Sequence, residues 1–266
     1  KVAVYMLYRL YVQLFDLEQR WNVLIIVIMI ISMMIGAFGG LAENSIRRVL
    51  GYQMLNGMPF ILVMLAFTSD DPRRALAAGI MYTIHHMVTV GSLILASGAI
   101  EETYGTGLLS KLSGLARRDP IIAWIFAAGA FSVVGFPPFS GMWGKLMIVF
   151  EIARVGGAWA WIAIAAIIIA SFAAFLAMLR VWRKVFWGKG LPEDKVPDEL
   201  VIRKKLMAPS AALILGSLCM FIFSGIVLDV VDAAAEQLLD TNAYTETVLG
   251  DEPIAVPNID EIQEGR

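Results

Sequence analysis

A lysine that follows a break in a long apolar segment is the residue best placed to do chemistry. Residues 121–150 are long and apolar enough to cross a bilayer. Four residues interrupt them: Gly135, Pro137, Pro138 and Gly141. The prolines remove backbone donors, and the glycines tolerate irregular dihedral angles. Lys145 comes next, and a lysine at membrane depth costs about 2.5–3.5 kcal/mol on insertion scales. The pattern therefore favours a transport site.

Two interpretations of this break stay open. Discontinuous helices that carry charged or polar groups are typical of ion paths in transporters. A buried lysine can change its charge near neutral pH, which a proton carrier requires. Alternatively, Pro137 and Pro138 only kink the helix, and Lys145 snorkels to the nearer membrane surface.

A second polar group lies in the apolar segment 75–100. His85 and His86 are neighbours, so on a helix they point about 100° apart and cannot face one ligand together. His85, Thr89 and Ser92 share one helix face, while His86 and Thr89 share another. Histidine titrates near neutral pH and passes protons. Packing through neutral imidazoles that bond to neighbouring helices is the alternative, and both interpretations account for the pair.

The composition is that of a membrane protein. Hydrophobic residues make up 59% of the chain, against about 45–50% apolar residues in soluble domains. We therefore predict an all-α, polytopic transmembrane helical bundle. The net charge of −2 gives no electrostatic basis for binding nucleic acid. Cys219 is the single cysteine, and two adjacent histidines lack metal-ligand spacing, so we expect no metal and no cofactor.

Apolar runs between polar connectors predict about seven membrane segments, one of them interrupted by Gly-x-Pro-Pro. The expected segments are residues 1–15, 21–40, 52–67, 75–100, 121–150, 158–186 and 206–231. The first is short for a span and does not begin with Met, so we expect the chain to start partway through a helix. Asp71 before Pro72 suits a helix start, and Gly156 and Gly157 suit a turn.

The connectors and the end of the chain carry the charges. Residues 43–48 and 188–205 are expected to be loops, the second with a short interfacial helix. Residues 236–266 form an acidic tail, expected to be extended or dependent on a partner. Most loop Lys and Arg residues follow the second, fourth and sixth segments, so that side should be cytoplasmic and the tail outside. Arg180 should snorkel to the cytoplasmic surface, and Glu151 should pair with Arg154.

Several stretches together resemble a known family: residues 1–10, 46–52, 85–88 and 135–145. They are similar to the antiporter-like subunits shared by Mrp-type sodium/proton antiporters and respiratory complex I. The double histidine and the run from Pro137 to Lys145 most resemble the D-type members of the Mrp branch. The resemblance covers residues 1–187 and implies that residues 1–235 are the second half of an antiporter-like transmembrane domain.

The resemblance also implies a function and roles for residues. It implies a proton-translocating subunit of a multisubunit cation/proton antiporter in the bacterial plasma membrane, a transporter and not an enzyme. Its partners would be other membrane subunits, protons and a monovalent cation, sodium first. Lys1 matches a central proton carrier, and Lys145 matches the residue that faces the far half-channel. His86, with His85 beside it, matches the water path between them, whereas Thr89 replaces a lysine that many members carry.

Two other functions remain open from the sequence. The first is an antiporter-like subunit of complex I or of a membrane hydrogenase, in which redox energy drives the same path. The second is a structural membrane subunit that only positions its partners. Apolar, water-free surroundings at Lys145, with both histidines packed against apolar side chains, would favour this structural role.

Overall fold

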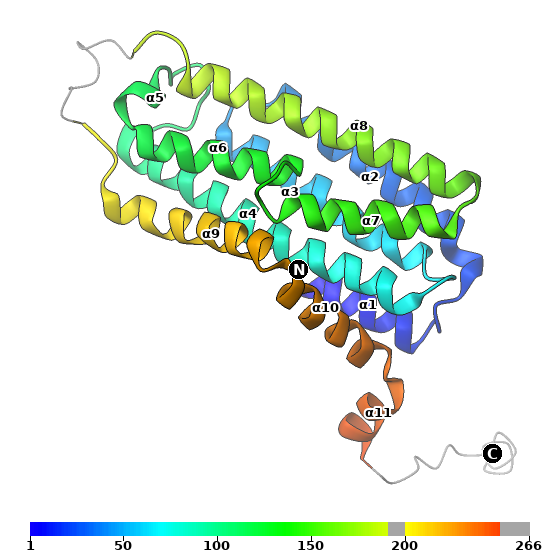
Figure 1. Cartoon of the computed structure of the whole chain (residues 1–266). Helices are drawn as coiled ribbons and strands as arrows, with labels where there is room; N and C mark the ends of the chain where they lie inside the picture. The colour runs from blue at the N-terminus through cyan, green and yellow to red at the C-terminus, as the bar shows by residue number, and fades with distance from the viewer. Residues whose placement is uncertain (191–199, 251–266) are drawn as a thin grey trace, which may run out of the picture.

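A computed structural model describes residues 1–190 and 200–250, and these residues form a bundle of helices (Figure 1). The helices are α1 (Val2–Gln13), η1 (Gln19–Trp21), α2 (Asn22–Ala42), α3 (Ile46–Leu62), η2 (Val63–Ala66), α4 (Pro72–Tyr104), α5 (Leu115–Arg118), α6 (Pro120–Val134), α7 (Gly141–Val155), α8 (Gly157–Val181), η3 (Trp182–Phe186), α9 (Lys204–Ile222), α10 (Ser224–Leu239) and α11 (Thr241–Leu249). Within these ranges the only β pairing is an isolated bridge between Ser45 and Leu108.

The predicted transmembrane helical fold is confirmed. In the described part of the chain, five helices are long and apolar enough to cross a membrane: α2, α3 with η2, α4, α8 with η3, and α9. The helices α6 and α7 have 15 residues each and together make up the interrupted segment. With α1, which has 12 residues, they complete the expected set of segments.

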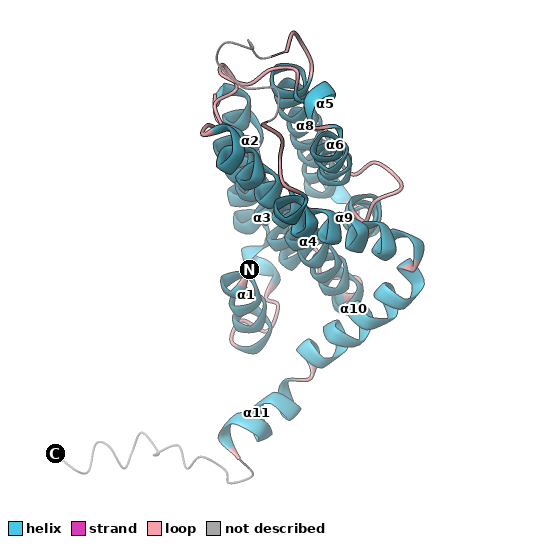
Figure 2. Ribbon diagram, turned by 90° about the vertical axis from the view of Figure 1, so that its left-hand side faces the viewer, coloured by secondary structure: helices cyan, strands magenta, loops and turns pink. Residues whose placement is uncertain are grey.

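The long helix α4 lies in the middle of the bundle, where α3, α6, α7, α9 and α10 pack against it (Figure 2). It begins where expected, because the Asp71 carboxylate accepts from the Arg74 N–H at 3.1 Å and caps the first turn. Gly105, in the left-handed conformation, ends it. Most side chains of α4 between Ala75 and Ile100 are buried, apart from an exposed stripe with Ile84, Met87 and Leu95, so the bundle fixes the polar groups on its other faces.

Buried apolar side chains form two separate cores along the bundle. On α4 the first core reaches Tyr82 and the second begins at Val90. On α9, Ile214 belongs to the second core, whereas Met220 packs against the first. Between the cores lie Gln53 and Asn56 of α3, His85, His86 and Thr89 of α4 and Ser217 of α9, whereas Ser92 and Ser210 lie at the level of the second core. The fold therefore leaves a layer near its middle that apolar packing does not fill.

Glycines allow α2 and α3 to pack closely. A Cβ atom at Gly36 would lie 2.5 Å from the backbone nitrogen of Asn56, and one at Gly39 would lie 2.3 Å from the ring of Tyr52. Small residues at such crossings let two helix backbones approach within the membrane. The contact holds the middle of α3, with its buried amides, against the bundle.

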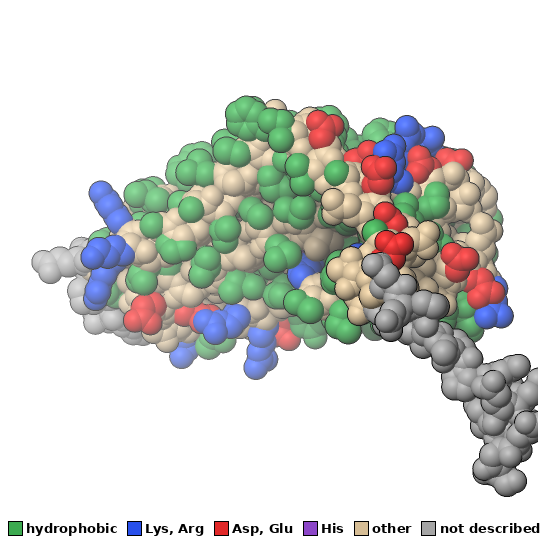
Figure 3. Space-filling model, turned by 90° about the horizontal axis from the view of Figure 1, so that it is seen from below, with side chains coloured by type: hydrophobic (Ala, Val, Ile, Leu, Met, Phe, Trp, Pro, Cys, Tyr) green, Lys and Arg blue, Asp and Glu red, His purple; other side chains and the backbone are tan. Residues whose placement is uncertain are grey.

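The connections after α2, α4 and α8 meet at one end of the bundle. The sequence assigned these three loops, which carry most of the loop Lys and Arg residues, to one side of the membrane. The N–H of Ile46 donates to the carbonyl of Gly107 at 2.9 Å, and the N–H of Gly114 donates to that of Trp187 at 3.2 Å. On the face seen in Figure 3, charged side chains gather toward both ends, and hydrophobic side chains cover most of the stretch between them. The membrane side on which this end lies stays a prediction.

Several boundaries differ from those expected. Residues 46–48 belong to α3 and not to a loop, because Ile46, Val49 and Leu50 form a buried helix face. The Arg180 guanidinium reaches the connector after α2, where it donates to the carbonyl of Glu43 and, at 2.9 Å, to Asn44 Oδ1; its snorkelling to a membrane surface stays a prediction. The long span 158–186 is confirmed, although its last turn, η3, is a π-helix.

The end of the chain also differs from its expectation. The last span stops at Ile222, and α10 continues in a new direction (Figure 1). The expectation of an extended segment is wrong for the part of the tail that α10 and α11 cover, where α10 runs to Leu239 because Val231, Ala235 and Leu238 form a buried stripe at helical spacing. The tail's dependence on a partner stays a prediction. Residues 191–199 and 251–266, with the expected interfacial helix and most of the acidic tail, lie outside the described residues. The domain boundary after residue 235 stays a prediction.

Candidate functional site

The helix α6 ends at the predicted break in a Schellman motif. Gly135 has a φ of +102°, its N–H donates to the carbonyl of Ser132 at 3.1 Å, and the N–H of Phe136 donates to that of Phe131 at 2.9 Å. The rings of Phe131 and Phe136 meet edge to face at 5.9 Å, the apolar contact that accompanies this cap. The cap satisfies the carbonyls of Phe131 and Ser132, and the prolines that follow cannot continue the helix.

The helix α7 begins at Gly141, where space matters more than dihedral freedom. A Cβ atom there would lie 1.9 Å from the carbonyl oxygen of Ser132 and 2.9 Å from His85 Cε1. The start of α7 therefore presses directly on the end of α6 and on α4. This close approach brings Ser140, just before α7, next to the histidine.

Lys145 lies one turn into α7, and its side chain points back to the break. The ammonium donates to the carbonyl of Val134 at 2.7 Å and to Ser171 Oγ of α8 at 2.9 Å. It also lies 5.3 Å from the centre of the Phe60 ring. The side chain is half-buried, and among the described residues it has no ion pair. The ammonium thus neutralises no acid and caps a free carbonyl at the break.

Four hydroxyl groups and His85 form a closed hydrogen-bonded ring. His85 Nδ1 lies 2.9 Å from Ser140 Oγ and 3.3 Å from Thr89 Oγ1. Thr89 Oγ1 lies 2.8 Å from Ser132 Oγ, and Ser217 Oγ of α9 joins Ser132 at 2.9 Å to Ser140 at 2.8 Å. All five side chains of this hydroxyl ring are fully buried. Each hydroxyl can both donate and accept, so the hydrogen bonds among the four hydroxyls can reverse direction, whereas His85 Nδ1 either donates or accepts.

His86 faces the opposite way, as the helical spacing predicted. Its Nε2 lies 3.2 Å from the backbone carbonyl of Gln53 on α3, and because a carbonyl only accepts, Nε2 carries a proton. Both side-chain amide atoms of Gln53, Oδ1 of Asn56 and Nε2 of His85 are buried without a partner among the described residues. Such groups are rare in native interiors and call for water or another ligand.

Aromatic rings lie between the lysine and the two histidines. Phe60, next to the Lys145 ammonium, stacks on Tyr82 with ring centres 5.2 Å apart. Tyr82 in turn lies 5.4 Å from the ring of His85 and 5.9 Å from that of His86. Direct contact from the lysine to the histidines therefore runs through apolar ring faces. Their polar connection is the segment between α6 and α7. Lys145 bonds to the Val134 carbonyl at one end of this segment, and His85 bonds to the Ser140 hydroxyl at the other.

Lys1 lies apart from the break. Its ammonium donates to Met58 Sδ of α3 at 3.4 Å, and the side chain is half-buried. It lines a cavity of about 300 Å³ together with residues of α4 and α10. The structure thus brings His85 and Thr89 together and sets Lys145 beside them at the break, while Lys1 and His86 face α3.

Two residues that belong to the site were not identified from the sequence. Ser217 completes the hydroxyl ring, and Ser171 holds the lysine. Ser92, expected to continue the His85 face, instead pairs with Ser210 of α9, the two hydroxyls lying 2.9 Å apart. The signal was present: Ser210 and Ser217 are seven residues apart in an apolar span and so share one helix face.

These residues form one polar layer between the two apolar cores. We define the polar layer as Gln53, Asn56, His85, His86, Thr89, Ser132, Ser140, Lys145, Ser171 and Ser217. No group of three or more His, Cys, Asp or Glu residues in the described ranges could hold a metal ion. The layer instead offers one amine, two imidazoles, two amides and five hydroxyls; the amine and the imidazoles can carry protons, and the hydroxyls can relay them.

The chain belongs to the family described as NADH:quinone oxidoreductase/Mrp antiporter, transmembrane, whose profile matches residues 1–175. It is therefore an antiporter-like membrane subunit with several membrane-spanning helices. This agrees with the family expected from the four sequence stretches.

Known relatives come from both branches of the family. The D-type subunit of the Na(+)/H(+) antiporter of Bacillus subtilis is 30% identical over 94% of this chain and 49% of that protein. A chain of the Mrp complex from Dietzia sp. DQ12-45-1b is 30% identical with a TM-score of 0.84, over 94% of this chain and 53% of that one. The N-type subunit of the NADH-quinone oxidoreductase of Hydrogenovibrio crunogenus is 30% identical over 76% of this chain and 41% of that protein. The chain spans about half the length of these relatives.

Proposed function

We propose that this chain is the proton-translocating second half of a subunit of a multisubunit cation/proton antiporter, with sodium as the first candidate cation. In this proposal it is a transporter and not an enzyme, and its partners are other membrane subunits. It lies in the bacterial plasma membrane with its C-terminal segment outside. The likeness to the D-type subunit of a Na(+)/H(+) antiporter and to the Mrp complex supports the class.

One observation carries the proposal: a lysine that has no acidic partner in residues 1–190 and 200–250 is held at a broken helix within the polar layer. Burying polar groups between two apolar cores is costly unless they are hydrogen-bonded, and ionisable residues within membrane segments typically mark ion paths. A purely structural lysine would be expected to reach a membrane surface or an acid. Lys145 instead donates to the carbonyl of Val134, which the end of α6 leaves free.

In the proposed mechanism the lysine and the hydroxyl ring do different work. Lys145 holds a proton as an ammonium, released when a second proton or cation approaches. His85 takes a proton on Nδ1 from Ser140 and releases one from Nε2 to water, and Ser217 and Ser132 pass Ser140 a replacement proton that Lys145 supplies through water at the break. Thr89 takes part as a relay that never carries charge, which fits a hydroxyl at this position. Lys1, which contacts Met58 of α3, is the proposed central carrier.

Unpartnered polar atoms indicate how water would complete the path. A buried polar atom without a hydrogen bond costs about 1–3 kcal/mol, so water that reaches it is stabilised there. The amide of Gln53, Oδ1 of Asn56 and Nε2 of His85 are such atoms. They lie on the α3 and α4 sides of the polar layer, toward Lys1. Water at these atoms would connect the histidines where side chains alone do not.

A second candidate function comes from the other branch of the family. The likeness to the N-type subunit of an NADH-quinone oxidoreductase supports a redox-driven subunit that uses the same residues. Genes for redox proteins next to this one would favour it, whereas genes for small hydrophobic subunits would favour the antiporter. A structural subunit that only positions its partners is the third candidate, and the next experiment tests it.

The test is Lys145→Ala in the complete complex, with cation/proton antiport measured in everted membrane vesicles. We expect antiport to be abolished while the complex still assembles. Lys111→Ala is the matched control, because this lysine is exposed in the connection after α4 and should leave transport unchanged. Antiport at the normal rate in an assembled Lys145→Ala complex would contradict the proposal and favour the structural role.

A further inference from the structure

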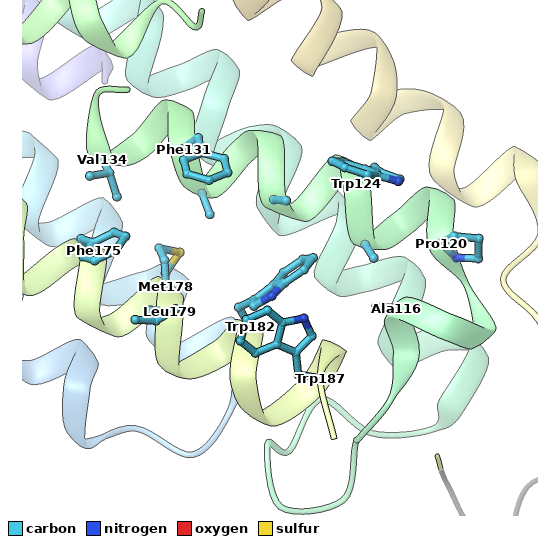
Figure 4. Close-up of a pocket in the computed structure, with 13 residues that line it drawn as sticks. Ala116, Pro120, Trp124, Phe131, Val134, Phe175, Met178, Leu179, Trp182 and Trp187 are labelled. Carbon is cyan, nitrogen blue, oxygen red and sulfur yellow. The ribbon is translucent and has the colours of Figure 1, made fainter. Parts of the chain in front are cut away.

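An apolar groove with a volume of about 530 Å³ lies between α6 and α8, away from the polar layer's interior (Figure 4). Phe131 and Trp124 of α6 face Phe175 and Met178 of α8 across it. The groove is open to the outside of the bundle, since the Trp124 side chain is 76% exposed. Its volume falls within the range of sites that hold a small molecule, about 300–1,000 Å³.

One end of the groove is closed by tryptophans whose position is fixed. Trp182 and Trp187 lie there with their rings 6.3 Å apart. The carbonyl of Trp187 accepts from the N–H of Gly114 at 3.2 Å and from Ser113 Oγ at 3.3 Å, which ties the end of η3 to the segment before α5. Tryptophan is enriched at the level of lipid headgroups, so this end suits the membrane interface.

Basic residues directly follow the groove residues of this end in the sequence. Arg117 follows the groove residue Ala116, and Arg183 and Lys184 follow Trp182. All three basic side chains are exposed, and none has an ion pair with a residue in the described ranges. The groove therefore combines an apolar surface with basic side chains at one end. An anionic phospholipid is complementary to it, with an apolar acyl chain and a negatively charged headgroup.

We propose that the groove binds one acyl chain of an anionic phospholipid, with its phosphate at Arg117, Arg183 and Lys184. A helix of 15 residues such as α6 is about 22 Å long, enough to follow one leaflet of a hydrocarbon core that is about 30 Å thick. Basic groups beside the cytoplasmic leaflet attract anionic headgroups. This proposal does not depend on proton transport. The far end of the groove is Val134, whose carbonyl binds Lys145, so the lipid would support the end of α6.

The test is photo-crosslinking of the complete complex in phosphatidylcholine vesicles that contain a minor fraction of a diazirine-labelled lipid. Labelled phosphatidylglycerol is compared with labelled phosphatidylcholine, and the labelled peptides are found by mass spectrometry. We expect the anionic probe to label the groove faces of α6 and α8 several-fold more strongly. The double variant Arg183→Ala with Lys184→Ala should reduce this labelling to the zwitterionic level. The matched pair Lys204→Ala with Lys205→Ala, exposed at the start of α9, should not.

A second variant tests the apolar part of the groove. Ala127→Phe would fill the groove and should lower labelling by both probes several-fold, whereas Ala165→Phe on the exposed face of α8 should not. Normal elution of each complex on size exclusion verifies folding. Three outcomes would each overturn the proposal. They are equal labelling by the two lipid probes, labelling that Ala127→Phe does not change, and labelling of a neighbouring subunit in place of α6 and α8.

Discussion

Replacing Ser217 by alanine should slow proton transport without displacing α9. The Ser217 hydroxyl links Ser132 and Ser140, and it is the part of the hydroxyl ring that comes from the last span. The backbone N–H of Ser140 also donates to the backbone carbonyl of Ser217 at 3.2 Å, a bond that alanine retains. The substitution thus opens the ring while the helix contact that positions it remains.

The magnitude follows from the contacts that are lost. Besides its two hydroxyl partners, Ser217 Oγ lies 3.3 Å from the Ser140 nitrogen, which gives three contacts. Interhelical polar contacts in membranes average about 0.6 kcal/mol, so their loss should destabilise the subunit by about 2 kcal/mol. If the proton-transfer barrier rises by about 1–2 kcal/mol, the transport rate falls about 5–30-fold.

Ser210→Ala is the matched control. Ser210 lies on the same face of α9, is fully buried, and contacts Ser92 Oγ at 2.9 Å and the Ser92 carbonyl at 2.7 Å. It should cost about 1 kcal/mol of stability and leave transport unchanged, because it lies outside the hydroxyl ring. Antiport rates in everted vesicles, corrected for the amount of assembled complex, measure both variants. Equal rates in the two variants would refute a role for the hydroxyl ring.

Other substitutions give further expected outcomes. His86→Ala should lower the antiport rate or shift its pH profile, measured in vesicles across a pH series; an unchanged profile would leave packing as the better account of this residue. Ser171→Ala removes one of the two hydrogen-bond partners of the break lysine, so the rate should fall several-fold while the complex assembles, and a normal rate would speak against that contact. Gly36→Ala places a Cβ atom 2.5 Å from the α3 backbone and should destabilise the subunit by about 1–3 kcal/mol, seen as a lower Tm in detergent. Gly98→Ala, with no atom within 4 Å, should keep or raise the Tm, and the reverse order of the two Tm values would contradict the packing argument.

The helix break between α6 and α7 shows which features of the site can be predicted from neighbouring residues in the sequence. Gly135 and the two prolines could be read as an interruption because each acts through its own backbone. The orientation of Lys145 could not, since a flexible side chain can reach a membrane surface or turn inward. The free carbonyl of Val134 and the hydroxyl of Ser171 decide it, and they come from different helices.

The sequence alone determined the membrane class, the approximate spans, the broken helix and the divergence of His85 from His86. These features depend on composition and on helical geometry, which act over a few residues. Only the tertiary structure decided which polar groups meet. Ser217 lies 77 residues from Ser140, and Gln53 lies 33 residues from His86. Their contacts depend on how helices cross, which is set by close packing at glycines such as Gly36 and Gly141 and by the two apolar cores. A pattern along the chain shows which face a residue occupies, but the partner on that face belongs to another helix.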